Sequence, residues 1–201
     1  WLTDKSRATP LGTWLMAAAP ATAEALGYGG FDFLVVDMEH VPVEFTDLAH
    51  ILRAIGCTPA DAVVRLAWND QVLVKRALDA GARTVMLPFV QNAEEAKAAA
   101  SFTRYPPHGI RGVAAVHRGS RFGTIPNYLK SANDDICTIV QLETPEAIER
   151  LAEIAAVEGI DGVFVGPGDL SAAMGHIGNI AHPEVQALIE KAAKDAHAAG
   201  K

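Results

Sequence analysis

CTIVQLE, residues 137–143, and GVFVGPGDLS, residues 162–171, are two short apolar runs that each lead into a carboxylate. Successive side chains of a strand point to opposite faces, so Gln141 and Glu143 share one face at the end of the first run. Asp169 lies just past the apolar part of the second run. Such apolar runs are typical of strands in a parallel sheet that is covered on both faces. The two stretches predict parallel strands with acids at their carboxyl ends.

These two acids, Glu143 and Asp169, have two interpretations. Carboxylates at strand ends of an α/β domain suit a hard cation such as Mg²⁺ or Mn²⁺, or another divalent metal at a mixed oxygen site. Each acid can instead cap the helix that follows it, because Asp is a common cap at a strand-to-helix junction. The spacing alone leaves both interpretations open.

Apolar runs of the same kind recur along the chain and alternate with Ala-rich helical stretches. This alternation indicates βα units and a parallel sheet. Strands are predicted at residues 12–16, 33–39, 62–66, 84–89, 137–143 and 162–166. Helices are predicted at residues 22–26, 43–55, 71–80 and 93–102, after Thr144 with Pro145 at the first helical position, and from Pro183 to about Gly200.

Six βα units in one chain predict a TIM barrel, whose eight units usually take about 250 residues. We expect a single domain over residues 1–201 that lacks the last two βα units, because an open six-strand sheet would expose edges that proteins normally cover. A doubly wound open sheet is the alternative fold.

A long polar insertion, residues 104–135, separates the fourth and fifth predicted strands and shows little helical periodicity. Loops of this length are usually functional or mobile. Arg111, Arg118 and Arg121 in this insertion can approach an anionic substrate or a neighbouring subunit, or they can simply be solvated.

The composition is that of a soluble globular protein whose partner is a small molecule. The chain has 201 residues, 50% hydrophobic and 20% charged, and a net charge of −7 without a basic run, which argues against nucleic acid. No apolar run is long enough for a membrane span, and the N-terminus lacks signal-peptide features, although a chain that begins at Trp1 could have lost a targeting segment. Cys57 and Cys137 lack CxxC spacing, so we expect reduced thiols and a cytoplasmic location.

Three further side chains at or near predicted element ends can take part in chemistry. His40 follows the second strand and can exchange a proton at neutral pH, or it can be a hydrogen-bonded structural histidine. Arg65 ends the third strand and can hold a carboxylate or an oxyanion, or form a salt bridge with Asp37 or Glu39. Asp79 ends a helix against the helix dipole, which suggests a specific partner such as a histidine.

Together these residues carry a resemblance to a known family. The matching motifs are DMEH (37–40), VVRL (63–66), LDAG (78–81), MLPFVQNAEEA (86–96), RYPPHGIRG (104–112), VQLET (140–144) and GVFVGPGDLS (162–171). From Gly12 to Lys201 the chain resembles the HpcH/HpaI class II pyruvate aldolases, most closely the 4-hydroxy-2-oxoheptanedioate (hydroxyketoacid) aldolase type. The resemblance implies a metal-dependent TIM barrel that cleaves 4-hydroxy-2-oxo acids to pyruvate and an aldehyde through a metal-stabilised pyruvate enolate.

The resemblance also implies a role for each motif residue. Glu143 and Asp169 become the ligands of Mg²⁺, Mn²⁺ or Co²⁺, Gln141 contacts the bound keto acid, and the backbone of Gly168 and Asp169 receives the pyruvate carboxylate. His40 becomes the general base, Asp79 raises its basicity, and Arg65 stabilises the enolate oxyanion. The motif has Gly168 where many relatives resemble GPADLS with Ala, which should matter little because backbone groups do the binding.

Two other functions stay open: a citrate-lyase-β-like carbon–carbon lyase that acts on a CoA thioester, and a non-catalytic keto-acid-binding barrel. His40 and Arg65 are both present, which disfavours the binder, and no basic cluster for nucleotide phosphates is evident. Lys75, Lys97 and Lys130 fall in helix or loop contexts, which disfavours an imine-forming aldolase. The resemblance further implies a homo-oligomer, commonly a hexamer.

Overall fold

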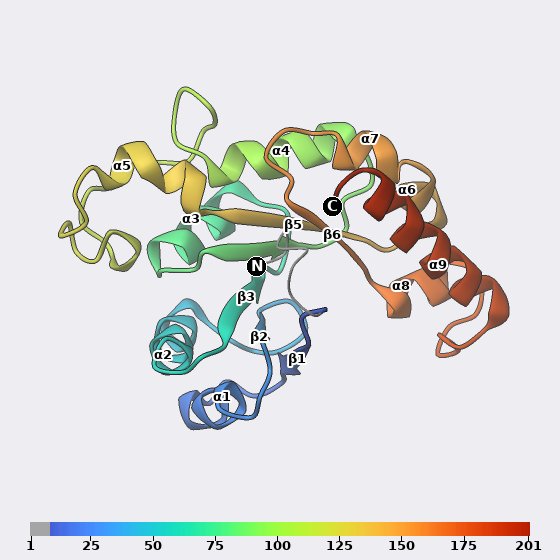
Figure 1. Ribbon diagram of the computed structural model, residues 1–201, viewed down its shortest axis with the longest axis horizontal. Coiled ribbons are helices and arrows are strands. Elements are labelled where there is room, and N and C mark those ends of the chain that lie inside the picture. Colours follow the sequence, from blue (N-terminus) through green and yellow to red (C-terminus); the bar gives the residue numbers. More distant parts are fainter. Residues whose placement is uncertain (1–8) are drawn as a thin grey trace.

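The computed structural model describes residues 9–201 and forms a curled sheet of six parallel strands with helices around its outside (Figure 1). The strand order follows the sequence, and every neighbouring pair is parallel. The strands are β1 (Gly12–Leu15), β2 (Phe33–Asp37), β3 (Asp61–Arg65), β4 (Thr84–Leu87), β5 (Cys137–Leu142) and β6 (Gly162–Val165). All six predicted strands are confirmed, and each ends one or two residues earlier than predicted.

The helices are α1 (Pro20–Gly27), α2 (Phe45–Ile55), α3 (Gln71–Asp79), α4 (Ala93–Thr103), α5 (Tyr128–Ser131), α6 (Pro145–Glu149), α7 (Leu151–Ala155), α8 (Pro167–Ala173) and α9 (Pro183–Ala198), with short 3₁₀ helices η1 (Arg118–Ser120) and η2 (Ala132–Asp135). The helices from α1 to α7 lie between successive strands, and α8 and α9 follow β6. Several begin at caps that the sequence contains: Asp70 caps α3, Asn92 caps α4 and Thr144 caps α6.

The insertion between β4 and β5 is more ordered than its sequence suggests. It contains η1, α5 and η2, each three or four residues long. Helices this short span about one turn, so they leave no hydrophobic periodicity in the sequence. In Figure 1 the insertion and α5 extend beyond α3, away from α9.

The two faces of the sheet bury two different hydrophobic clusters. Outward-facing residues such as Leu34, Val64 and Val140 pack under the helices in the main core. Inward-facing residues form a small second cluster of Val35, Val63, Met86 and Ile139, with Trp14 and Phe164 against it. A second cluster enclosed by the concave face of a parallel sheet is the packing of a β/α barrel interior.

The architecture is therefore TIM-barrel-like, and the doubly wound alternative is wrong because a sheet of that kind reverses its strand order. In residues 9–201 the sheet runs from β1 to β6 without a pairing that joins these two strands. No helix of this part of the chain is both long and apolar enough to cross a membrane. The expectation for the N-terminus concerns residues 1–8 and lies outside the described residues.

Candidate active site at the carboxyl ends of the strands

The predicted site residues continue the inward-facing rows of the sheet at its carboxyl edge. Asp37 is the register partner of Arg65, and Arg65 is the partner of Met86. Gln141 pairs with Phe164 in the same way. Since register partners in a parallel sheet point to the same face, these polar side chains lie on the face that holds the inner cluster. The strand period thus places them on the concave face of the sheet, at its carboxyl edge.

Arg65 is fixed by two carboxylates and an indole ring. Its Nε and one Nη donate to the two oxygens of Asp37 at 3.0 and 2.7 Å. Its other Nη lies 3.0 Å from Glu39, and the guanidinium stacks on Trp14 at 4.3 Å from the ring centroid. The predicted salt bridge with Asp37 or Glu39 is confirmed, and it involves both acids. A guanidinium has five N–H donors, so two remain for a ligand.

Glu143 is oriented by a strained turn after β4. The backbone N–H of Phe89 donates to Glu143 at 2.8 Å, and Phe89 adopts a φ of 55°, in the left-handed region. Gln141 Nε2 donates to the other carboxylate oxygen at 2.7 Å. Positive φ at a bulky residue costs about 1–3 kcal/mol and is concentrated at functional sites. The turn aims one N–H at Glu143 and leaves the ring of Phe89 exposed beside Trp68, with the ring centroids 5.9 Å apart.

The carboxylates at this edge have divergent pKa values. Burial, together with the negative charges of Glu39 and Asp169, raises the pKa of Glu143 to about 7, against the lowering effect of the hydrogen bond from Phe89. Burial also raises the pKa of Glu39, more than the charge of Arg65 lowers it. Burial acts in the same direction on Asp37, but the hydrogen bonds from Arg65 and from the backbone outweigh it and lower the pKa. Arg65 therefore neutralises Asp37, while no cationic side chain among residues 9–201 is paired with Glu143 in the same way.

A divalent cation fits this set of donors. Glu143 and Gln141 are both about 2% exposed, and Gln141 Oε1 has no hydrogen-bond partner among the described residues. Asp169 lies in the first turn of α8, close enough to Glu143 to raise its pKa. Two carboxylates with an amide oxygen nearby form an all-oxygen set, which suits a hard cation that keeps several water ligands. A cation here also offsets the repulsion between the acids.

His40 and Gly168 lie at the rim of this site. The His40 side chain is 63% exposed, and its Nε2 lies 3.8 Å from Glu39, so the ring is open to a ligand. Gly168 lies in the first turn of α8, where backbone N–H groups lack partners within the helix. A Cβ on Gly168 would meet no atom within 4 Å, so an Ala at this position fits the backbone.

Asp79 lies away from the other predicted residues. It ends α3, which returns the chain to the amino end of β4, whereas His40 follows the carboxyl end of β2. The described contacts of Asp79 are with the insertion: Arg111 donates to it at 2.8 Å, and His117 Nε2 lies 3.6 Å away. The expected specific partner therefore includes a histidine, but this histidine is His117, and the structure brings Asp79 and His40 of one chain to opposite edges of the sheet.

Three residues of the site were missed by reasoning from the sequence: Trp14, Phe89 and Gly166. Trp14 shares the inward face of β1, so the strand period could have placed it beside Arg65. Gly166 allows Glu143 to pack, because a Cβ there would lie 2.7 Å from Glu143 Oε1 and 2.9 Å from Gln141 Nε2. The backbone turn at Phe89 has no such signal, apart from Pro88 before it.

The fold and the site define a TIM-barrel-like α/β protein with an acid-rich, arginine-containing site at the strand ends, and the comparisons with known proteins agree. The model of the HpcH/HpaI aldolase/citrate lyase family matches residues 11–201, and the chain belongs to this family. It is 61% identical over 188 residues to a 2-dehydro-3,6-dideoxy-6-sulfogluconate aldolase of Pseudomonas putida, covering 94% of this chain and 74% of that protein.

Two further matches come from a curated enzyme and a crystal structure. The 4-hydroxy-2-oxo-heptane-1,7-dioate aldolase of Salmonella heidelberg is 53% identical over 192 residues, with 95% of this chain and 73% of that protein covered. An HpcH/HpaI aldolase/citrate lyase family protein from Burkholderia cenocepacia superposes with a TM-score of 0.94 at 41% identity, covering 99% and 79% of the two chains. The predicted family and the predicted enzyme class, an aldolase and hence a carbon–carbon lyase, are confirmed.

Proposed function

We propose that this protein is a divalent-metal-dependent aldolase that reversibly cleaves 4-hydroxy-2-oxo acids to pyruvate and an aldehyde. The observation that carries the proposal is the arrangement at the carboxyl edge, where Arg65 retains two free donors opposite the acidic side of Glu143. Cleavage next to a ketone requires a positive group near the oxygen and a proton acceptor. The two curated relatives are named for 2-oxo acids, which supports the substrate class.

Arg65 is proposed to stabilise the oxyanion that develops on the 2-oxo group. Asp37 and Trp14 hold the guanidinium in one orientation, so its remaining N–H groups are already aimed when charge develops. Such prearranged donors need no reorganisation during the reaction. Gln141 would contact the keto acid through its unpartnered Oε1 or its amide, and the N–H groups of Gly168 and Asp169 would receive the carboxylate.

His40 is proposed to accept the proton of the 4-hydroxyl group in the cleavage direction and return it in synthesis. Its exposed ring at the rim can reach a substrate that Arg65 holds. An effect of Asp79 on the basicity of His40 requires a second copy of the chain, because the two residues lie at opposite edges within one copy. This requirement agrees with the proposed homo-oligomer, in which we expect six subunits.

Glu143 and Asp169 are the proposed ligands of the metal, for which we propose Mg²⁺, Mn²⁺ or Co²⁺. When bound, the cation supplies a Lewis acid that polarises the 2-oxo group. Phe89 and Gln141 orient Glu143 for this purpose, and Gly166 leaves room for it. We also propose that the six units belong to an eight-unit barrel within a single domain, and that the protein acts in the cytoplasm.

The first test is pyruvate release from 4-hydroxy-2-oxoheptanedioate, measured after EDTA treatment and after addition of Mg²⁺, Mn²⁺ or Co²⁺. We expect activity to disappear with EDTA and to return with metal. Activity that persists without metal would support an imine mechanism. A complete lack of turnover with several 4-hydroxy-2-oxo acids would support a CoA-thioester lyase or a binding protein.

Two variants separate proton transfer from metal binding. We expect His40→Ala to lower retro-aldol turnover by about 10²- to 10⁴-fold while the metal still binds. Glu143→Ala should lose both the metal and the activity, as calorimetric titration with Mn²⁺ would reveal. Unchanged turnover of His40→Ala would remove His40 from the role of base.

A further inference from the structure

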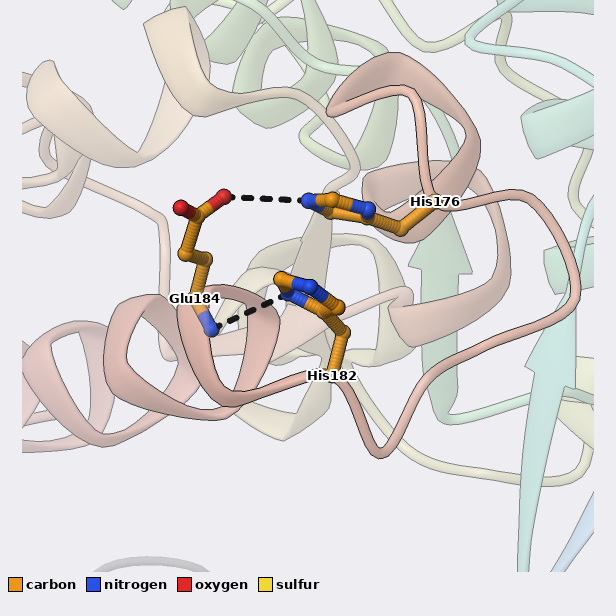
Figure 2. Close-up of side chains that lie close together, drawn as sticks. All are labelled: His176, His182 and Glu184. Atoms are coloured by element: carbon orange, nitrogen blue, oxygen red, sulfur yellow. Dashed lines mark hydrogen bonds and ion pairs between the residues drawn. The ribbon is translucent and has the colours of Figure 1, made fainter.

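A second group of side chains that could bind a metal lies away from the site described above, in and around the segment that joins α8 to α9 (Figure 2). His176, His182 and Glu184 each present one ligand atom, and these atoms lie within 4.8 Å of one another. We propose that this group binds one divalent transition-metal ion such as Zn²⁺ or Ni²⁺, and that the ion fastens the segment after α8 to the start of α9. Imidazole nitrogens with a single carboxylate suit these borderline ions better than Mg²⁺.

The backbone brings the two histidines together without help from a metal. The segment makes two successive turns, with hydrogen bonds from Asn179 N to His176 O at 2.9 Å and from His182 N to Asn179 O at 3.1 Å. The N–H of His176 also donates to Ser171 in α8 at 2.7 Å. Because both ends of the segment are tied to helices, little conformational entropy remains to be lost when a metal binds.

The side chains are already in contact. The two imidazole rings stack with centroids 3.5 Å apart and planes 15° apart, and His176 Nε2 lies 3.0 Å from Glu184 Oε2. The hydrogen bond from His176 lowers the pKa of Glu184, so its carboxylate is ionised at neutral pH.

Metal binding requires the two imidazole rings to turn out of their stack, because a metal lies in the plane of each ring that binds it, while the ligand atoms themselves are already close. Ligand atoms of a tetrahedral zinc site lie roughly 3.3 Å apart, given metal–ligand bonds of about 2.0–2.2 Å. The ion would replace the hydrogen bond from His176 Nε2 to Glu184, with the proton of the neutral ring on Nδ1. It would also replace the long hydrogen bond of 3.3 Å that His182 Nδ1 accepts from the N–H of Glu184. The Glu184 side chain is 70% exposed and free to rotate, and water would complete the coordination.

The helix dipole opposes a cation at this place, and Glu184 compensates for it. The site borders the N-terminus of α9, where the partial charge is positive. Glu184 lies in the first turn of α9 and contributes a full negative charge directly at the site. We therefore expect the ion to be held by direct bonds to the two histidine nitrogens and to Glu184, and not by the negative charge of the surrounding surface.

The experiment measures Zn²⁺ binding in a variant that lacks a proposed ligand of the catalytic metal, so that only the histidine site is observed. In the Glu143→Ala variant, we expect one Zn²⁺ per chain by calorimetric titration and elemental analysis after dialysis. Addition of His176→Ala and His182→Ala should weaken Zn²⁺ binding by about 100-fold or more, because the loss of ligands costs at least as much as the loss of their supporting groups. The control is Glu143→Ala with His50→Ala, which removes an exposed histidine of α2 and should leave the stoichiometry at one.

A spectroscopic measurement on the unaltered chain gives an independent result. Co²⁺ in a four-coordinate site with nitrogen ligands absorbs strongly in the visible range, whereas an all-oxygen, six-coordinate site absorbs weakly. We expect the strong band in the unaltered chain and in Glu143→Ala, and its loss in the double histidine variant, whose fold is checked by circular dichroism. Equal Zn²⁺ binding with and without the two histidines, or no Zn²⁺ binding in Glu143→Ala, would overturn the proposal.

Discussion

The two edges of the sheet contain the same kind of unit, a buried arginine paired with an aspartate and stacked on an aromatic ring. At the carboxyl edge, Arg65 makes two bonds to Asp37 and stacks on Trp14 at 4.3 Å. At the other edge, Arg111 makes one bond to Asp79 and stacks on Tyr105 at 4.4 Å. The chemistry is alike, but the surroundings differ.

The difference lies in what each unit holds. Arg65 bridges adjacent strands and also reaches Glu39, so its position is set by the rigid sheet. Arg111 belongs to the insertion, and its bond to Asp79 fastens the insertion to α3. Its Nε and one Nη have no hydrogen-bond partner among the described residues. We infer that the carboxyl-edge unit serves catalysis and that the other unit serves the stability of the insertion, and the predictions below test this division.

The largest effect is expected from Arg65→Lys. Lysine keeps the charge but loses the planar fork that contacts Asp37, Glu39 and the substrate at once. We expect kcat/KM for the retro-aldol reaction to fall by about 10³-fold, or about 4 kcal/mol. The matched variant Arg111→Lys should lower kcat/KM by less than tenfold. Equal losses of kcat/KM in the two variants would mean that the Arg65 unit is no more important for catalysis than the Arg111 unit.

The next effect concerns the stability of the other edge. Arg111→Met removes the buried partner of Asp79, and removal of one member of a buried pair costs about 3–5 kcal/mol. Because the Asp79 side chain is 25% exposed, we expect the lower end of this range in the free energy of unfolding, measured with urea. Asp79→Asn combined with Arg111→Met should lose less than the sum of the two single variants. If Arg111→Met were as stable as the original chain, the pair of Arg111 and Asp79 would not stabilise the insertion.

A smaller effect is expected from Gly166→Ala. The added methyl group would lie 2.7 Å from Glu143 Oε1, so the carboxylate or Gln141 must move. We expect kcat/KM to fall by about 10- to 100-fold, or roughly 1.4–2.8 kcal/mol. In Gly168→Ala, two residues later, the added methyl group would meet no atom within 4 Å. We therefore expect the fall in kcat/KM to be at least tenfold smaller than in Gly166→Ala. If the two variants lose activity equally, crowding of Glu143 is not the cause.

The sequence predicted the carboxyl edge better than the other edge, for a physical reason. The strand period fixes the face of a side chain, so Asp37, Arg65 and Gln141 could be placed together before any coordinates were known. The six strands were found for the same reason. Asp79 was correctly expected to have a specific partner, but the partner belongs to an insertion without hydrophobic periodicity, so the sequence could not indicate where that partner lies.

Contacts that depend on backbone turns could not be predicted either. The left-handed turn at Phe89 and the double turn that stacks His176 on His182 arise from local backbone geometry. No periodic pattern encodes such geometry, and a bulky residue at positive φ is disfavoured by local propensity. These are also the places where polar groups are brought together at short distance.

The smallest effect tests how closed the amino end of the inner cluster is. Cys137 begins β5 beside this cluster, and burial together with the negative charge of Asp161 raises the pKa of its thiol to about 11. The reactive thiolate is therefore scarce at pH 8 and becomes more abundant as the pH approaches 11. At pH 8 we expect iodoacetamide to label the exposed Cys57 in the folded protein, and to label Cys137 only in urea, as peptide mass spectrometry would report. Equal labelling of both cysteines in the folded protein at pH 8 would mean that this end of the cluster is open to solvent. The amino edge of the sheet would then be as accessible as the carboxyl edge, which must admit the substrate.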